Sequence, residues 1–231
     1  MKFISLYLAL LGVMLCLTLS STVMAGGKVG IYGIRMVPYG IDAEQYSSPG
    51  WGLGIHAVVP VPKLANVFAG TIGFELINLL NHTDSFIDDR TGLRIEQQTD
   101  QNYLRFYLGG QVGGHGNGFL RPHAGANIAL VLYTIRTDVV VPDDYNREQE
   151  IRQTLKDEGH LNIGYDLSMG LDLNFSNTIA LDGGVRYVKS FSVPEQLGEG
   201  SVRIHPSYVQ IYFGVGISLE MLHLQGDEGA E

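Results

Sequence analysis

The sequence LNIGYDLSMGLDLNF, residues 161–175, decides the fold. Its odd-numbered positions are all apolar or aromatic, whereas its even-numbered positions are polar or glycine. Successive side chains of a strand point to opposite faces, so a period of two gives one apolar face and one polar face. A helix would scatter both sets around its circumference. The segment is therefore predicted to be a β-strand with two chemically different faces.

Seven further segments repeat this alternation. They span residues 28–40, 51–59, 68–76, 103–112, 120–130, 179–187 and 208–219. Each is long enough to cross a membrane as a tilted strand of roughly 9–11 residues. The first segment is the least regular of the eight. There we expect Tyr32, Ile34 and Met36 on the apolar outer face and Arg35 on the inner face.

The connections between these segments alternate in length. Short turns at residues 60–66, 113–118 and 176–178 alternate with longer connections at 41–49, 81–101, 137–160 and 193–206. A short helix is expected within residues 143–158. Short turns at one end and longer loops at the other are typical of outer-membrane barrels. We predict an all-β domain over residues 26–220, an eight-stranded antiparallel up-and-down transmembrane β-barrel.

The polar face of the predicted strands is rich in glycine and carries balanced charges. Glycine makes up 30 of the 231 residues, and much of it falls on this face. A soluble barrel would alternate in the same way with its apolar face inward. A narrow interior favours small residues, and an Arg or Lys facing lipid costs roughly 2–4 kcal/mol, so we place this face inside. The predicted polar network of the lumen comprises Arg35, Glu75, Arg105, Arg121, Asp166, Asp172, Asp182 and Arg186.

One pair within this network yields a local expectation. If residues 176–178 form a tight turn, Asp172 faces Asp182 on the next strand. Two facing carboxylates repel each other unless a cation lies between them or one holds a proton. Arg121, at a similar depth on the preceding strand, is the expected partner, so a guanidinium is predicted in contact with the pair.

The chain ends are predicted to lie outside the barrel domain. Residues 1–25 combine a basic tip, an apolar stretch and a small-residue end, which is typical of a secretory signal peptide cleaved after Ala25. An uncleaved membrane anchor is the alternative. Leu15 precedes Cys16 where lipidation needs a small residue. Residues 221–231 form an acidic tail, which this topology places in the periplasm.

Composition excludes several classes of protein. The net charge of −9 argues against nucleic-acid binding, and a single cysteine excludes a disulfide framework. No stretch after the predicted signal peptide approaches 18 apolar residues, so no transmembrane helix is expected. The acids of the long loops fit no calcium-loop template, and no metal site is predicted. Those acids include Asp84, Asp88, Asp89, Asp100, Asp143 and Asp144.

The chain resembles the small eight-stranded outer-membrane β-barrels of Gram-negative bacteria, the OmpA-like barrel domain. The sequence RPHAGAN, residues 121–127, is similar to the family's mid-barrel strand, and GGVRY, residues 183–187, to its penultimate strand. Residues 208–219 resemble its final strand. The resemblance implies a place in the cell outer membrane among lipid and lipopolysaccharide, after insertion by the barrel-assembly machinery. Family chains often end on an aromatic residue, whereas this one continues into its acidic tail.

The residues give little sign of catalysis. No nucleophile elbow, P-loop or dinucleotide fingerprint is present, so we predict no catalytic residue and no cofactor. His205 and Ser207 resemble the His and Ser of lipid A deacylases, but Pro206 separates them and Tyr208 replaces the family's Asn. We predict a non-enzymatic structural or surface-interaction protein acting through acidic extracellular loops. The alternatives are a narrow channel or conduit for small hydrophobic ligands, and a lipid A-modifying enzyme.

Overall fold

The computed structural model describes most of the predicted barrel domain. The described residues are 27–61, 64, 67–87, 90, 92, 94–113, 119–141, 151–176, 178–191, 193–197 and 200–218. The predicted signal peptide with its cleavage site at Ala25, and the predicted tail, lie outside these residues, so both stay predictions. Within the described residues, no helix is both long enough and apolar enough to cross a membrane.

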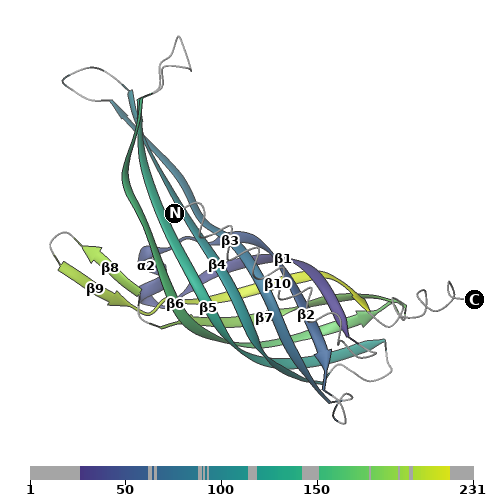
Figure 1. Ribbon diagram of the computed structural model, residues 1–231. Helices are drawn as coiled ribbons and strands as arrows, with labels where there is room; N and C mark the ends of the chain where they lie inside the picture. The colour runs from purple at the N-terminus through teal and green to yellow at the C-terminus, as the bar shows by residue number, and fades with distance from the viewer. Residues whose placement is uncertain are drawn as a thin grey trace, which may run out of the picture.

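Eight antiparallel strands close into a barrel (Figure 1). In ring order they are β1 (Lys28–Tyr39), β10 (Ser207–Ser218), β7 (Ile179–Ser190), β6 (Ile151–Asn174), β5 (Leu120–Val141), β4 (Arg94–Gly113), β3 (Phe68–Ile87) and β2 (Gly50–Pro60). The first and last strands pair from Lys28 opposite Ser218 to Tyr39 opposite Ser207. The predicted eight-stranded antiparallel up-and-down architecture is confirmed.

Two smaller elements lie in connections at the end of the ring opposite Lys28 and Ser218. A helix of 6 residues, α2 (Ile41–Tyr46), joins β1 to β2. The connection between β7 and β10 forms a separate two-stranded sheet from β8 (Val193–Leu197) and β9 (Gly200–Ile204).

Four strands continue beyond the ring as an extended sheet, which we call the arm (Figure 1). Strands β3, β4, β5 and β6 are 20, 20, 22 and 24 residues long. The long loops predicted at 81–101 and 137–160 are therefore wrong, because most of these residues pair in register across β3–β4 and β5–β6. The predicted helix is wrong over 151–158, which belong to β6; residues 143–150 lie outside the described part. Polar runs that resemble loops in the sequence are here paired strands of a sheet.

In seven of the ring strands the predicted set of side chains points into the lumen, whereas in β1 the inward and outward sets are exchanged. Tyr32, Ile34 and Met36 are buried inside the barrel, and Arg35 lies on the outer face. The Arg35 guanidinium stands 4.6 Å from the centre of the Trp51 ring on β2. Because β1 has apolar side chains on both faces, the period of two did not specify its orientation. Arg35 is therefore not part of the lumen network.

Glycines of the inner face lie directly opposite tyrosines. Tyr32 pairs with Gly54, Tyr107 with Gly73, and Tyr212 with Gly184. A Cβ atom added at Gly73 would lie 2.3 Å from the Tyr107 ring, and one at Gly54 would lie 2.5 Å from the Tyr32 ring. The rings cover the bare backbone of the neighbouring strand, an arrangement that compensates for the weak packing of glycine in sheets. This pairing gives the glycine excess a specific role inside the barrel.

The outer face of the ring is apolar. Exposed large side chains on the strands include Ile31, Trp51, Leu53, Leu76, Leu108, Ile128, Leu130, Ile163, Leu167, Met169, Phe213 and Ile217. Charged side chains are buried inside the same ring, with Glu75, Arg105 and Asp166 fully enclosed. Water-soluble proteins show the opposite distribution, because exposed apolar patches of this size are unfavourable in water.

Candidate functional site

A quartet of charged side chains crosses the middle of the lumen. Arg105 on β4 donates to Glu75 on β3 at 2.9 Å and also binds Asp166 on β6. Arg186 on β7 binds Glu75 from the other side, and its Nε atom lies 3.5 Å from an Asp166 carboxylate oxygen. Each carboxylate thus contacts both guanidiniums. The quartet is electrically balanced, with two negative and two positive groups.

Neutral partners satisfy the remaining carboxylate lone pairs. Gln210 on β10 donates to Glu75 at 3.2 Å, and the Tyr32 hydroxyl donates to the same carboxylate at 2.8 Å. Asn127 on β5 donates to Asp166 at 2.7 Å. The Tyr107 ring lies 4.6 Å from the Arg105 guanidinium and 4.9 Å from that of Arg186. Buried charges are tolerated when they are paired and hydrogen-bonded in this way.

Four of the eight residues predicted for the lumen network, Glu75, Arg105, Asp166 and Arg186, lie in contact with one another, whereas Arg35 lies on the outer face. Three neutral residues that bind the quartet, Gln210, Asn127 and Tyr32, were not predicted. Gln210 and Asn127 were detectable, because they occupy inward positions of strands whose facing the alternation predicted. Tyr32 was missed because β1 was assigned the wrong face.

A second charged cluster lies nearer the end of the barrel opposite the arm. Asp172 on β6 stands directly opposite Asp182 on β7, as predicted. The cation between them is the ammonium of Lys28 on β1, which binds Asp172 and lies 3.3 Å from Asp182. Arg121, the predicted guanidinium, lies opposite Asp172 in the β5–β6 register, and its contact with the carboxylate pair stays a prediction. Lys28 was overlooked because the facing predicted for β1 put its even-numbered residues, Lys28 among them, on the outer face.

Two buried histidines complete this second cluster. The Nε2 atom of His56 on β2 lies 3.5 Å from Asp182, and His123 on β5 stands 3.9 Å from Asp172 and 3.8 Å from Asp182. A cavity of about 20 Å³ adjoins the cluster and has His56, His123, Asp182 and Tyr212 in its wall. A cavity of this size accommodates about one water molecule. The interior is thus filled by side chains, as expected for eight strands.

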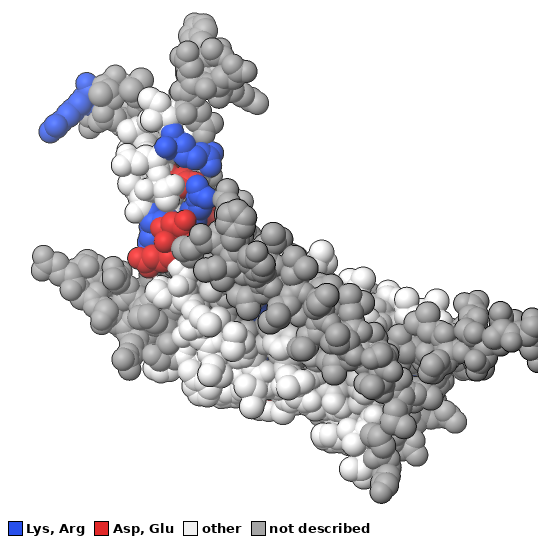
Figure 2. Space-filling model, in the orientation of Figure 1, with Lys and Arg blue, Asp and Glu red and all other residues white. Residues whose placement is uncertain are grey.

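The arm carries charges of both signs (Figure 2). Asp138 on β5 accepts a hydrogen bond from Thr154 at 2.8 Å and pairs with Arg136 at 3.0 Å and Arg152 at 3.4 Å. The Thr154 hydroxyl and the Arg136 guanidinium hold the pKa of Asp138 below its usual value. The described part of the arm is therefore a surface of mixed charge, and the acidic extracellular loops stay a prediction. Asp88, Asp89, Asp143 and Asp144 lie outside the described residues.

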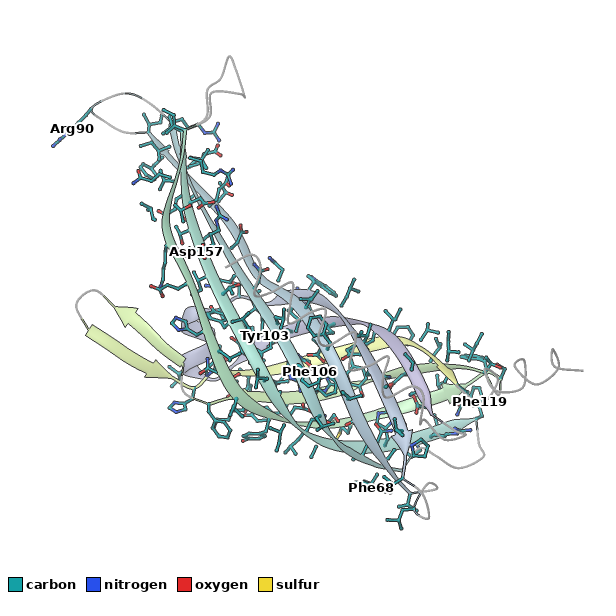
Figure 3. The ribbon with its side chains drawn as sticks, viewed as in Figure 1. Phe68, Arg90, Tyr103, Phe106, Phe119 and Asp157 are labelled. Carbon is teal, nitrogen blue, oxygen red and sulfur yellow. The ribbon has the colours of Figure 1, made fainter. Side chains whose placement is uncertain are left out.

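Within the arm, its two edge strands, β3 and β6, each pair with a neighbouring strand on one side only in the described structure. Beyond Asn78, β3 pairs only with β4, and residues 151–162 of β6 pair only with β5, among the strands that the structure describes. Both edges carry exposed apolar side chains, Phe86 and Ile87 on β3 and Ile151 and Leu155 on β6. Figure 3 shows side chains projecting from both faces of the arm, with Asp157 near its base.

The arrangement of His205 and Ser207 does not favour catalysis. Ser207 is buried and accepts a hydrogen bond from the Tyr187 hydroxyl at 3.3 Å, whereas the His205 side chain is exposed. A serine nucleophile needs a general base within hydrogen-bond reach, which a tyrosine that donates to it does not supply.

Comparison with known proteins shows what fold this is. Neisserial surface protein A matches with a TM-score of 0.51 at 13% identity, over 84% of this chain and 98% of that one. Ail, the attachment invasion locus protein of Yersinia pestis, matches with a TM-score of 0.43 at 12% identity, over 84% and 99%. No protein-family model matches the sequence, and neither does any curated protein. The chain therefore has the fold of a small eight-stranded outer-membrane β-barrel.

Proposed function

We propose that this chain is an integral protein of the cell outer membrane that carries a recognition arm on the outer side and performs no catalysis. The apolar outer face of the ring supports the membrane position, since lipid is the solvent in which that face is stable. Chains of this kind are inserted by the barrel-assembly machinery and are surrounded by lipid and lipopolysaccharide. The short-turn end with both chain termini faces the periplasm.

The observation that carries the recognition role is the arm itself. Phe86 lies eight residues beyond the last β2–β3 pair at Asn78, which corresponds to roughly 25 Å along the strand. Apolar side chains so far from the ring are outside the membrane and exposed to water. Together with two unpaired strand edges, they form a surface suited to binding another molecule, because edges of this kind pair readily with a further strand.

Two alternatives make different predictions. A narrow channel or conduit for small hydrophobic ligands requires a passage, but the quartet and its tyrosines cross the lumen. A lipid A-modifying enzyme requires a reactive Ser207 beside His205, whereas Ser207 is buried and accepts a hydrogen bond from Tyr187. Loss of lipid A modification in a His205→Ala or Ser207→Ala variant would favour the enzyme.

The test compares the full chain with a trimmed chain on intact cells. Asn-Gly turns would join Leu80 to Gln101 and Ile135 to Glu158, which removes the arm at paired positions of the ladder. A Phe86→Ser/Leu155→Ser variant keeps the arm but removes its exposed apolar groups. We expect all three chains to show heat-modifiable gel mobility, and only the full chain to mediate cell–cell or cell–surface adhesion. Equal adhesion by the trimmed chain would refute the role of the arm.

A further inference from the structure

We propose that Asp172, Asp182, His123 and His56 form a binding site for a divalent transition-metal ion, with Zn²⁺ as the fitting ion, and that Lys28 occupies this site in the metal-free protein. The site lies inside the barrel at the end opposite the arm. It is independent of the surface role proposed above, because none of its side chains belongs to the arm.

The donor atoms are buried and close together. Asp172, Asp182, His123 and His56 each expose less than a tenth of their surface, and they come from four different strands. One ligand atom from each of His123, Asp172 and Asp182 can be chosen so that all three lie within 4.8 Å of one another. Tetrahedral zinc with bonds of about 2.0–2.2 Å holds its donors about 3.3–3.6 Å apart. Binding an ion would therefore require the donors to approach one another by up to about 1.5 Å.

Three buried polar atoms of this cluster make no hydrogen bond within the described structure. They are Nε2 of His56, Nδ1 of His123 and Oδ1 of Asp182. Buried polar atoms are almost always hydrogen-bonded, so three exceptions in one cluster call for a physical explanation. His123 and Asp182 belong to the group of residues whose ligand atoms lie within 4.8 Å of one another, and His56 adjoins that group through Nε2, 3.5 Å from Asp182. A bound metal ion would give these atoms a partner.

The hydrogen bonding of His123 leaves one nitrogen suited to a metal. Its Nε2 atom lies 3.2 Å from the Tyr212 hydroxyl. If Nε2 carries the proton and donates it to Tyr212, Nδ1 presents a lone pair towards the Asp172 carboxylate at 3.9 Å. Two electron-rich atoms facing each other need a cation between them. Metal-binding histidines characteristically donate their other ring N–H to such a partner.

Charge and donor type point to a transition metal. Asp172, Asp182 and Lys28 by themselves sum to a charge of about −1 when both imidazoles are neutral, and Arg121 lies beside them, opposite Asp172. A divalent ion in place of the ammonium makes that sum zero. Two imidazole nitrogens with two carboxylate oxygens are a donor set typical of zinc, whereas calcium and magnesium prefer oxygen alone. The exchange is feasible because the Lys28 side chain is long, stands at the start of β1 and is only partly buried.

Cobalt and zinc titrations of the full chain without an affinity tag test the site. After treatment with a chelator, the refolded protein should bind one Co²⁺ with the visible absorption of a tetrahedral complex, and Zn²⁺ should displace it. His123→Ala and Asp172→Asn should weaken binding by more than the roughly 10–100-fold typical of changes in the outer shell. Lys28→Met should bind about tenfold more tightly or better, because it removes a competing cation.

A matched control separates the site from surface chelation. His160 on the arm lies 3.5 Å from Glu158, and a His160→Ala variant should bind Co²⁺ as the wild type does. Heat-modifiable mobility verifies that each variant has folded. Absence of the tetrahedral spectrum in the wild type, or unchanged affinity in His123→Ala or Lys28→Met, would overturn the proposal. If His123→Ala does not fold, the gain of affinity in Lys28→Met still decides the question.

Discussion

Substitution of Arg105 should show how much the charged quartet contributes to the free energy of unfolding of the barrel. Arg105 is fully buried and contacts both carboxylates, so an Arg105→Met variant leaves the quartet with two negative groups and one positive group. Breaking a buried ion pair by deleting one partner costs about 3–5 kcal/mol, since the remaining charge is left uncompensated. Arg186, Gln210 and Asn127 still bind the carboxylates, but none of them supplies the missing positive charge.

A second substitution should restore the balance. In Arg105→Met/Asp166→Asn one carboxylate and one guanidinium remain, so the double variant should be more stable than the sum of the single changes predicts. Coupling energies between groups in one network amount to about 0.5–3 kcal/mol. Arg35→Met is the matched control, because Arg35 is an arginine of the same barrel on the outer face. It loses the contact with Trp51, about 0.5–1 kcal/mol, and also removes a charge from the lipid-facing side, so it should be destabilised by no more than about 1 kcal/mol.

The assay is reversible unfolding in denaturant of chains refolded into lipid vesicles. For every variant, gel mobility measures the fraction of the protein that is folded. The fluorescence of the single tryptophan, Trp51, on the outer face reports insertion into the membrane. If Arg105→Met is no less stable than Arg35→Met, or if the double variant is simply additive, the quartet does not have the role inferred here.

Three further results are expected. Gly73→Ala should destabilise the barrel by about 1–3 kcal/mol, because its new methyl group meets the Tyr107 ring. Gly33→Ala should not, because the nearest atom to a Cβ added there is 3.9 Å away. The same unfolding assay compares the two variants. The pKa of Asp138 is lowered in the folded arm by Thr154 and Arg136, so its contribution to stability is present above the unfolded value of about 3.9 and is lost as the pH falls through the folded value. Carboxyl NMR titration measures the pKa, and Asp138→Asn should remove this one contribution to the pH dependence of unfolding. Planar bilayers containing the wild type should show no stable open state, and sustained conductance would favour the channel alternative.

The sequence predicted the ring well because alternation is a local property. The stretch at 161–175 and its six clearer counterparts each show one apolar and one polar face, and the barrel follows from placing the polar faces inside. The opposition of Asp172 and Asp182 also followed, since a tight turn fixes the register of a hairpin.

The features that were not predicted depend on contacts between strands that are distant in the sequence. The arm was read as loops because polar residues interrupt its alternation, so no continuous apolar stripe marks it as a sheet. Lys28 reaches Asp172 across a sequence separation of 144 residues, and no local pattern indicates that contact. His56 and His123 lay on predicted inner faces, but their convergence with two carboxylates depends on ring closure.

Ring closure also explains why β1 could be assigned to the wrong face. In β3, β4, β6 and β7, a shift of register by one residue would turn a buried charge of the quartet towards lipid, at roughly 2–4 kcal/mol for an arginine near the midplane. Strand β1 contributes no member of the quartet, and its inward charge, Lys28, stands at its end. Three contacts determine which side chains of β1 point into the lumen. They are the Tyr32 ring against Gly54, the hydrogen bond from Tyr32 to Glu75, and Arg35 beside Trp51. The closing strand is therefore oriented by contacts that exist only once the other seven strands are in place.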